Sequence, residues 1–155
     1  MIDDKETSCF MHLLCRFMNC GKTYLLPVSN SEAVQLDKVL LGYYDDEYVN
    51  SFKLRENVAS RLLGYYDDEY VYFIPSVVIG AANTMLHRHN HLPFNMRKIQ
   101  RNLFAMNMIK VHWILSAEVS YRPQKRVGTT RRRYITFYKN PLYEFMAGVN
   151  GRTDA

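Results

Sequence analysis

Hydrophobic residues recur at helical spacing in two consecutive stretches of the second half of the chain. Between Ser76 and His89 they fall one, three and four residues apart, which predicts a helix with one apolar face. The sequence from 90 to 93 interrupts this pattern. A second, more basic helix is predicted over Asn95–Met106, with Asn95 as its N-terminal cap.

Around these helices the hydrophobic period falls to two, which is typical of strands. Tyr70–Ile74, closed by Pro75, predicts a strand before the first helix. Further extended segments are expected after the second helix, at Val111–Leu115, Val119–Arg122 and Tyr134–Tyr138. The stretch 123–133 between the last two contains Gly128 and many cations, so it predicts the basic loop of a β-hairpin.

The first half contains an exact internal repeat. The decapeptide Leu-Leu-Gly-Tyr-Tyr-Asp-Asp-Glu-Tyr-Val occupies residues 40–49 and again 62–71, and two copies are too few for a solenoid. Short helices are predicted over Glu32–Leu41 and Phe52–Leu63, each ended by a glycine, Gly42 or Gly64, in a left-handed cap. After Gly64 the pattern predicts an extended segment, an acidic turn at 67–69 and the strand 70–74.

Length and composition bound the class of protein. A chain of 155 residues, 48% of them hydrophobic, can bury a core and forms one domain, or one domain with an extension. No apolar run approaches the roughly 18 residues of a membrane span, so no membrane partner is expected. The acidic N-terminus does not resemble a signal peptide, and three cysteines (Cys9, Cys15 and Cys20) match no zinc pattern. We therefore expect a cytoplasmic protein with free thiols.

Charge divides the chain into two unlike halves. The net charge of +5 is the sum of −5 over residues 1–83 and +10 over residues 84–155. Between Arg88 and Lys139 the sole acidic residue is Glu118. Such an asymmetry indicates that the C-terminal half faces a polyanion.

The order strand, helix, turn, basic helix and hairpin is that of a winged helix-turn-helix domain. The sequence thus predicts an α+β fold, with a winged helix-turn-helix over residues 62–145, a helical N-terminal extension over 1–61 and a flexible tail over 146–155. In this interpretation the helix at about 95–106 enters the major groove of double-stranded DNA, whose width suits a helix. The wing at about 122–134 contacts phosphates.

The candidate DNA-binding residues are cations and amides on this helix and wing. Those able to contact base edges are Asn95, Arg97, Gln100 and Arg101. Those expected on phosphates are Arg97, Lys98, Arg101, Arg122, Lys125, Arg126, Arg131, Arg132 and Arg133. We expect no catalytic residue, no metal and no cofactor.

The stretch from Leu63 to Pro75 resembles the start of a small C-terminal domain found in primase-helicase and replication proteins of plasmids, prophages and other mobile elements. A glycine, an acidic turn, an aromatic strand and a proline come in the same order, and the helix at 97–108 and the hairpin ending at 131–135 are similar too. The resemblance covers about residues 62–138. It implies a winged-helix module that holds DNA, with a replication protein as a possible partner. Where the family commonly has a small residue or glycine after the second helix, this chain has Asn107.

Three alternative functions would depend on other residues. A protein-interaction module would use the acidic, Tyr-rich segment 40–71 to dock a basic partner. A metal-dependent enzyme would use His87, His89 and His91, but on a helix end these side chains would splay apart. Base stacking would fall to the tyrosines that neighbour cations, Tyr121, Tyr134 and Tyr138, although packing explains them equally well.

Overall fold

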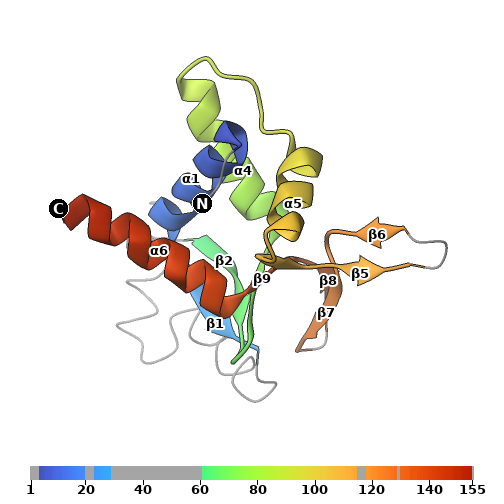
Figure 1. The fold of residues 1–155 in the computed structure, drawn as a ribbon. Helices are drawn as coiled ribbons and strands as arrows, with labels where there is room; N and C mark the ends of the chain where they lie inside the picture. Colours follow the sequence, from blue (N-terminus) through green and yellow to red (C-terminus); the bar gives the residue numbers. More distant parts are fainter. Residues whose placement is uncertain (1–3, 20–22, 29–60, 115–117, 129, 155) are drawn as a thin grey trace, which may run out of the picture.

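A computed structural model describes residues 4–19, 23–28, 61–114, 118–128 and 130–154 (Figure 1). Within these ranges the chain has a mixed α+β fold, as the sequence predicts, with helices gathered over a central sheet. The helices are α1 (Lys5–Asn19), α4 (Pro75–Arg88), α5 (Met96–Ala105) and α6 (Lys139–Asp154). The strands are β1 (Thr23–Pro27), β2 (Arg61–Tyr66), β3 (Tyr70–Phe73), β4 (Ile109–Lys110), β5 (His112–Trp113), β6 (Val119–Ser120), β7 (Gln124–Val127), β8 (Thr130–Arg133) and β9 (Ile135–Tyr138).

The central sheet has the order β1-β2-β3-β9-β4. Strand β1 runs parallel to β2, and the other neighbours are antiparallel. Strand β9 is paired on both sides, because Phe137 lies opposite Val71 of β3 and opposite Ile109 of β4. The hairpins β5–β6 and β7–β8 form separate two-stranded sheets. The basic segment 123–133 is therefore a hairpin in itself. The sequence predicts that 134–138 pairs with 119–122, but β9 pairs with β3 and β4 instead.

The helices cover one face of the sheet. Val71, Phe73, Ile135 and Phe137 alternate along β3 and β9 and are almost completely buried. Against them pack the apolar faces of all four helices, through Phe10, Leu14, Val78, Ala82, Ile99, Leu103 and Leu142. Burying a side chain of this size contributes about 1.5–3 kcal/mol, so this cluster is the main source of stability.

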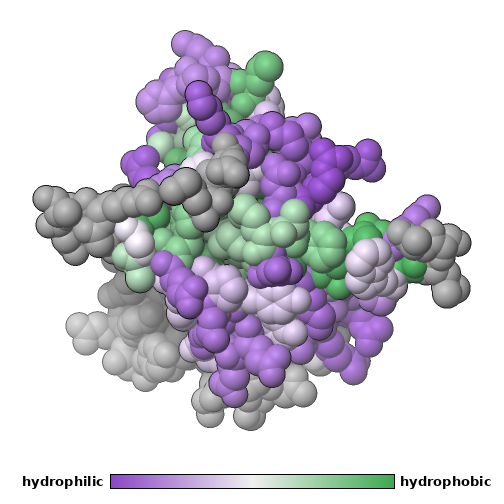
Figure 2. Space-filling view, viewed as in Figure 1, coloured by the Kyte–Doolittle hydropathy of each residue, from purple (hydrophilic) through white to green (hydrophobic). Residues whose placement is uncertain are grey.

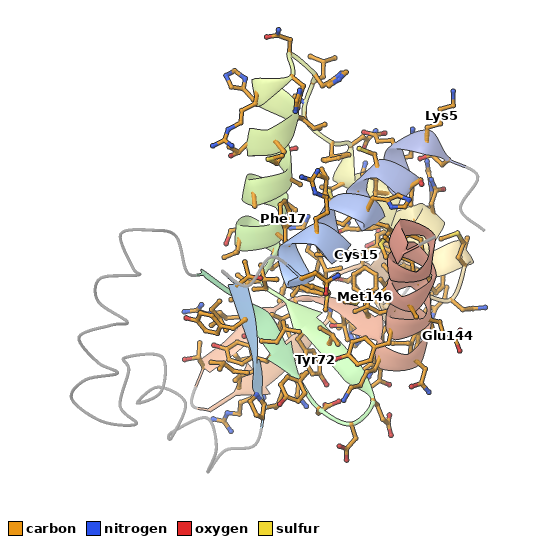
Figure 3. All side chains as sticks on the ribbon, turned by 90° about the vertical axis from the view of Figure 1, so that its left-hand side faces the viewer. Lys5, Cys15, Phe17, Tyr72, Glu144 and Met146 are labelled. Carbon is orange, nitrogen blue, oxygen red and sulfur yellow. The ribbon has the colours of Figure 1, made fainter. Side chains whose placement is uncertain are left out.

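A smaller cluster lies on the other face of β3. It consists of Tyr72, Tyr134 and Val127, each less than a tenth exposed. The rings of Tyr72 and Tyr134 meet edge to face at 6.1 Å, and Figure 3 shows Tyr72 among the strands, below α1. Because Val127 belongs to β7, this cluster attaches the β7–β8 hairpin to the side of the sheet away from the helices.

The second copy of the decapeptide forms most of the β2–β3 hairpin, including the acidic turn that the sequence predicts. The carboxylate of Asp67 accepts hydrogen bonds from the amides of Glu69 and Tyr70 at 2.9 and 2.8 Å, and from the hydroxyl of Tyr72 at 2.7 Å. Lys139 donates to the backbone carbonyl of Asp67 at 3.1 Å. This carboxylate therefore orders a turn, in the manner of an Asx turn.

Gly64 is not the helix cap that the sequence predicts, because it lies inside strand β2 opposite Phe73. A Cβ at this position would lie 1.8 Å from the carbonyl oxygen of Tyr72, so the two strands approach too closely for any side chain. The helix predicted over Phe52–Leu63 is accordingly wrong at 61–63. Its remaining residues, the helix predicted at 32–41, Gly42 and the first decapeptide lie outside the described residues.

Helices α4 and α5 confirm the predicted pair to within one residue at each end. The side chain of Asn95 caps α5 by accepting a hydrogen bond from the amide of Lys98 at 3.2 Å. Asn107 ends α5 in the left-handed region, with φ of 58°, and Met108 donates to the carbonyl of Leu103 at 2.9 Å. Asparagine tolerates this conformation better than most residues other than glycine, so it can end the helix here.

The predicted N-terminal extension and C-terminal tail differ from the observed fold. Helix α1 contributes to the main core and β1 pairs with β2, so the described parts of residues 1–61 share one core with the rest. Figure 3 shows Cys15 of α1 and Met146 of α6 in the region where the two helices meet the sheet. Helix α6 continues to Asp154, through the segment predicted as a tail. None of the helices described is long and apolar enough to cross a membrane.

Candidate nucleic-acid interface

Helix α5 presents two arginines to solvent. Ile99 and Leu103 are fully buried and hold one side of the helix in the core. Arg97 and Arg101 are exposed and, four residues apart, lie on the same side of the helix. These two candidates are therefore accessible from solvent.

The other two polar candidates at the start of α5 contact α1. The ammonium of Lys98 lies 3.3 Å from a carboxylate oxygen of Asp4 and 2.9 Å from one of Glu6. The hydrogen bonds that Lys98 donates to the carboxylates of Glu6 and Asp4 raise the pKa of its ammonium. The backbone amide of Asn95 donates to Glu6 at 2.8 Å, while its side chain caps the helix. Both residues therefore join α5 to α1 rather than standing free for DNA.

Gln100 and Arg122 bind each other beneath the surface. Gln100 is only 6% exposed, and its side-chain oxygen accepts a hydrogen bond from Nε of Arg122 at 2.9 Å. Burial lowers the pKa of the Arg122 guanidinium. The pair ties α5 to the segment that follows β6. A buried amide that is already hydrogen-bonded cannot read a base edge, so this part of the predicted site has a structural role.

The β7–β8 hairpin carries the densest group of cations in the described structure. Arg126 lies directly opposite Arg131, and Lys125 lies opposite Arg132. Because side chains alternate along a strand, Arg126, Arg131 and Arg133 share one face of the hairpin. Lys125 lies on the other face, where its ammonium is 5.3 Å from the ring centre of Tyr72. Gly128 takes a φ of 62° at the turn.

A cleft of about 410 Å³ separates this hairpin from the chain between β4 and β5. It is lined on one side by Lys110, Val111 and His112 and on the other by residues of the hairpin and its approach. Those on the hairpin side are Pro123, Gln124, Lys125, Arg126, Arg131 and Arg133. The residues that line it include several cations and no carboxylate, so the lining is positively charged.

Among the described residues, no carboxylate lies within ion-pair distance of these cations, although Asp67 interacts electrostatically with Lys125. The ion pairs found in the described part of the chain, with nitrogen and oxygen within 4.0 Å, join Lys98 to Asp4 and Glu6. Arg133 donates instead to the hydroxyl of Ser120 and the carbonyl of Arg122, each at 3.3 Å. The four arginines of the hairpin are exposed and therefore present their positive charge to solvent, whereas Lys125 is half-buried.

The β5–β6 hairpin carries exposed hydrophobic side chains that were not among the residues predicted from the sequence. Trp113 is 60% exposed and Ile114 is 45% exposed. The indole of Trp113 meets the ring of Phe104 on α5 edge to face at 6.0 Å, and Phe104 meets Tyr121 at 6.3 Å. The alternating pattern over 111–115 predicts a strand but not which of its faces is covered. The one feature of the sequence that distinguishes this position is that Trp113 is the single tryptophan of the chain.

The tyrosines proposed for stacking are mostly engaged in packing. Tyr134 is 2% exposed and contacts Tyr65 and Tyr72. Tyr121 is half-buried against Phe104. Tyr138 is 37% exposed, but its ring leans on Tyr70 of the neighbouring strand.

The histidines and cysteines that the structure describes do not gather into one site. His87 and His89 lie at the exposed end of α4 and His91 in the loop beyond it, as the sequence predicts. No group of three metal-binding side chains occurs among the residues that the structure describes. Cys9 is exposed and Cys15 buried, whereas Cys20 lies outside the described residues.

Comparisons with known proteins return no relative. No protein-family model matches the chain, and neither a curated protein nor a solved structure is significantly similar to it.

Proposed function

We propose that this chain is a double-stranded DNA-binding module of the winged helix-turn-helix type. Helices α4 and α5 follow one another between β3 and β4, and β9 returns between these two strands. This order of elements supports the proposal. The wing corresponds to the β7–β8 hairpin, and α5 and the hairpins lie toward the same side of the molecule in Figure 1.

The observation that carries the proposal is the pairing of like charges across the β7–β8 hairpin. Cations directly opposite each other destabilise a β-ladder, and this hairpin has two such pairs in succession, Arg126 with Arg131 and Lys125 with Arg132. A free hairpin gains nothing from this arrangement. A bound row of phosphates would remove the repulsion and convert it into binding free energy.

The exposure and hydrogen bonds of these residues support a narrower set of DNA contacts than the sequence does. Arg97 and Arg101 of α5 would enter the groove, and the arginines of the hairpin would contact phosphates. Asn95, Lys98 and Gln100 would act indirectly, by holding α5 in position. As in the replication proteins that the sequence resembles, the module would hold DNA for a partner, or act alone as a small regulator.

The proposal is tested by the salt dependence of binding to a fluorescently labelled duplex. About five phosphate contacts predict a slope of log K against log salt near −4.5 between about 50 and 200 mM NaCl. Replacing Arg126, Arg131 and Arg133 together by glutamine should reduce the magnitude of the slope by about 2.7, at about 0.9 for each phosphate. Fluorescence anisotropy measures both quantities.

A charge-matched variant controls for net charge. Lys5, Arg16 and Arg88 are exposed cations on α1 and α4, far in the sequence from the hairpin. Replacing these three by glutamine should leave the slope within about 0.9 of the original value. If both triple variants changed the slope equally, or if wild-type affinity did not depend on salt, the proposal would be wrong.

A further inference from the structure

The β5–β6 hairpin exposes a hydrophobic surface beside the cationic cleft. Trp113 and Ile114 are 60% and 45% exposed, an unusual state for such large apolar side chains next to each other. Figure 2 shows this hydrophobic surface at the outer end of the molecule, over the β5–β6 hairpin. The Phe104 ring supports the indole from one direction, 6.0 Å away and inclined at 71°. The indole is thus held by α5 and still faces solvent.

Strand β5 carries the indole and also forms part of the wall of the cleft. His112, which precedes Trp113 in β5, lines the cleft together with Lys110 and the hairpin arginines. Because side chains alternate along a strand, the indole of Trp113 lies on the opposite face of β5 from His112, toward Phe104 of α5. A flexible single strand whose phosphates lie in the cleft would therefore reach the indole by passing around the edge of β5. The exposed, supported indole and the cationic cleft on the other face of β5 are the two elements by which proteins bind single strands, a charged groove and an aromatic surface on which bases stack.

We propose that Trp113 stacks on an unpaired base of a nucleic acid whose phosphates occupy this cleft. The inference rests on the proposed function and extends it, since a base within an intact duplex cannot reach the indole face. The preferred ligand is then DNA that contains unpaired bases, either a single strand or a single-stranded overhang next to a duplex. In that second ligand, α5 contacts the duplex while β5 contacts the overhang.

Because Trp113 is the single tryptophan of the chain, intrinsic fluorescence reports on this site alone. The full chain is titrated at low salt with oligothymidine, with a blunt duplex and with the same duplex carrying a thymidine overhang. Stacking should quench the fluorescence with the two ligands that have unpaired bases and leave it nearly unchanged with the blunt duplex. Heparin, a polyanion without bases, should bind without quenching.

Substitution gives an independent measurement. Trp113→Ala should weaken binding of oligothymidine by about 5- to 100-fold, the usual effect of losing one base–aromatic stack. Its affinity for the blunt duplex should not change, which also shows that the variant is folded. Trp113→Phe, which keeps an aromatic face, should recover part of the loss.

The outcomes separate this inference from the proposed function. Salt-dependent duplex binding without quenching by any DNA would overturn the stacking role and leave the duplex-binding proposal standing. Equal quenching by heparin and oligothymidine would also overturn it, because the change in fluorescence would then not depend on bases. Failure of the wild-type chain to bind any of the three DNAs would overturn the proposed function itself.

Discussion

Replacing Arg131 by glutamate should stabilise the protein and weaken its binding to DNA at the same time. In the present hairpin Arg131 lies directly across from Arg126, so two positive charges face each other in solvent. A glutamate at this position turns the repulsive pair into an attractive one. The same change removes one phosphate contact and puts a negative charge on the face that would bind DNA.

The size of the stabilisation follows from the cross-strand geometry. Directly opposite side chains on neighbouring strands have Cβ atoms about 4.5–5.5 Å apart, and an opposite-charge pair contributes roughly 0.2–1 kcal/mol. Adding the lost repulsion, and allowing for solvent screening, we expect the free energy of unfolding to rise by about 0.5–1 kcal/mol. At 1 M salt the Debye length falls to about 3 Å, shorter than the separation of the pair, so most of the gain should disappear.

The measurement is urea unfolding at low salt and at about 1 M NaCl, since urea does not itself screen charge. Arg131→Gln, which removes the repulsion without adding attraction, should give an intermediate gain. In parallel, the slope of log K against log salt for duplex binding should shrink by about 1–2 for the glutamate variant. A fall in stability at low salt, or a gain that persists unchanged at high salt, would refute the reasoning.

Three further predictions concern the scaffold. Gly64→Ala should lower the free energy of unfolding by about 3 kcal/mol or more, because the added Cβ meets a backbone oxygen. Gly80→Ala, which has open space around it in α4, should raise the free energy of unfolding by about 0.5–1 kcal/mol. Chemical unfolding measures both changes. Burial raises the pKa of Asp67, but its hydrogen bonds outweigh burial and hold the pKa below its ordinary 3.8. The stability that Asp67 contributes is therefore present above pH 3.8 and is lost as the pH falls further. Asp67→Asn should lower the free energy of unfolding by about 1 kcal/mol at neutral pH and make thermal stability less dependent on pH in the acid range. Iodoacetamide at pH 8 should alkylate exposed Cys9 and spare Cys15, whose pKa burial raises to about 11, as peptide mass spectrometry will show.

The elements that the sequence predicts well are those set by local rules. The helix α5 follows from its hydrophobic period and the capping side chain of Asn95, both of which are visible in the sequence. The turn after β2 follows equally from the acidic residues at 67–69. In each case the groups that decide the conformation lie within a few residues of one another.

What could not be predicted depends on contacts between distant parts of the chain. Strand β9 pairs with β3 and β4, whereas hairpin periodicity favours a neighbour in sequence. Lys98 matches the other α5 cations in residue type, and only the position of α1 reveals that it is ion-paired. Gly64 resembles a helix cap because nothing nearby in sequence shows that the carbonyl of Tyr72 lies against it.

The pairing of β9 on both sides also has a mechanical consequence. Only Tyr134 separates β8, with its arginines, from the first residue of β9. A force applied to the hairpin is therefore transmitted to β9 along the direction of the strand. The hydrogen bonds to β3 and β4 then resist together in shear, instead of opening one after another as in an unzipping edge strand. A force applied to the hairpin is therefore resisted by both neighbours of β9 before the rest of the sheet is disturbed.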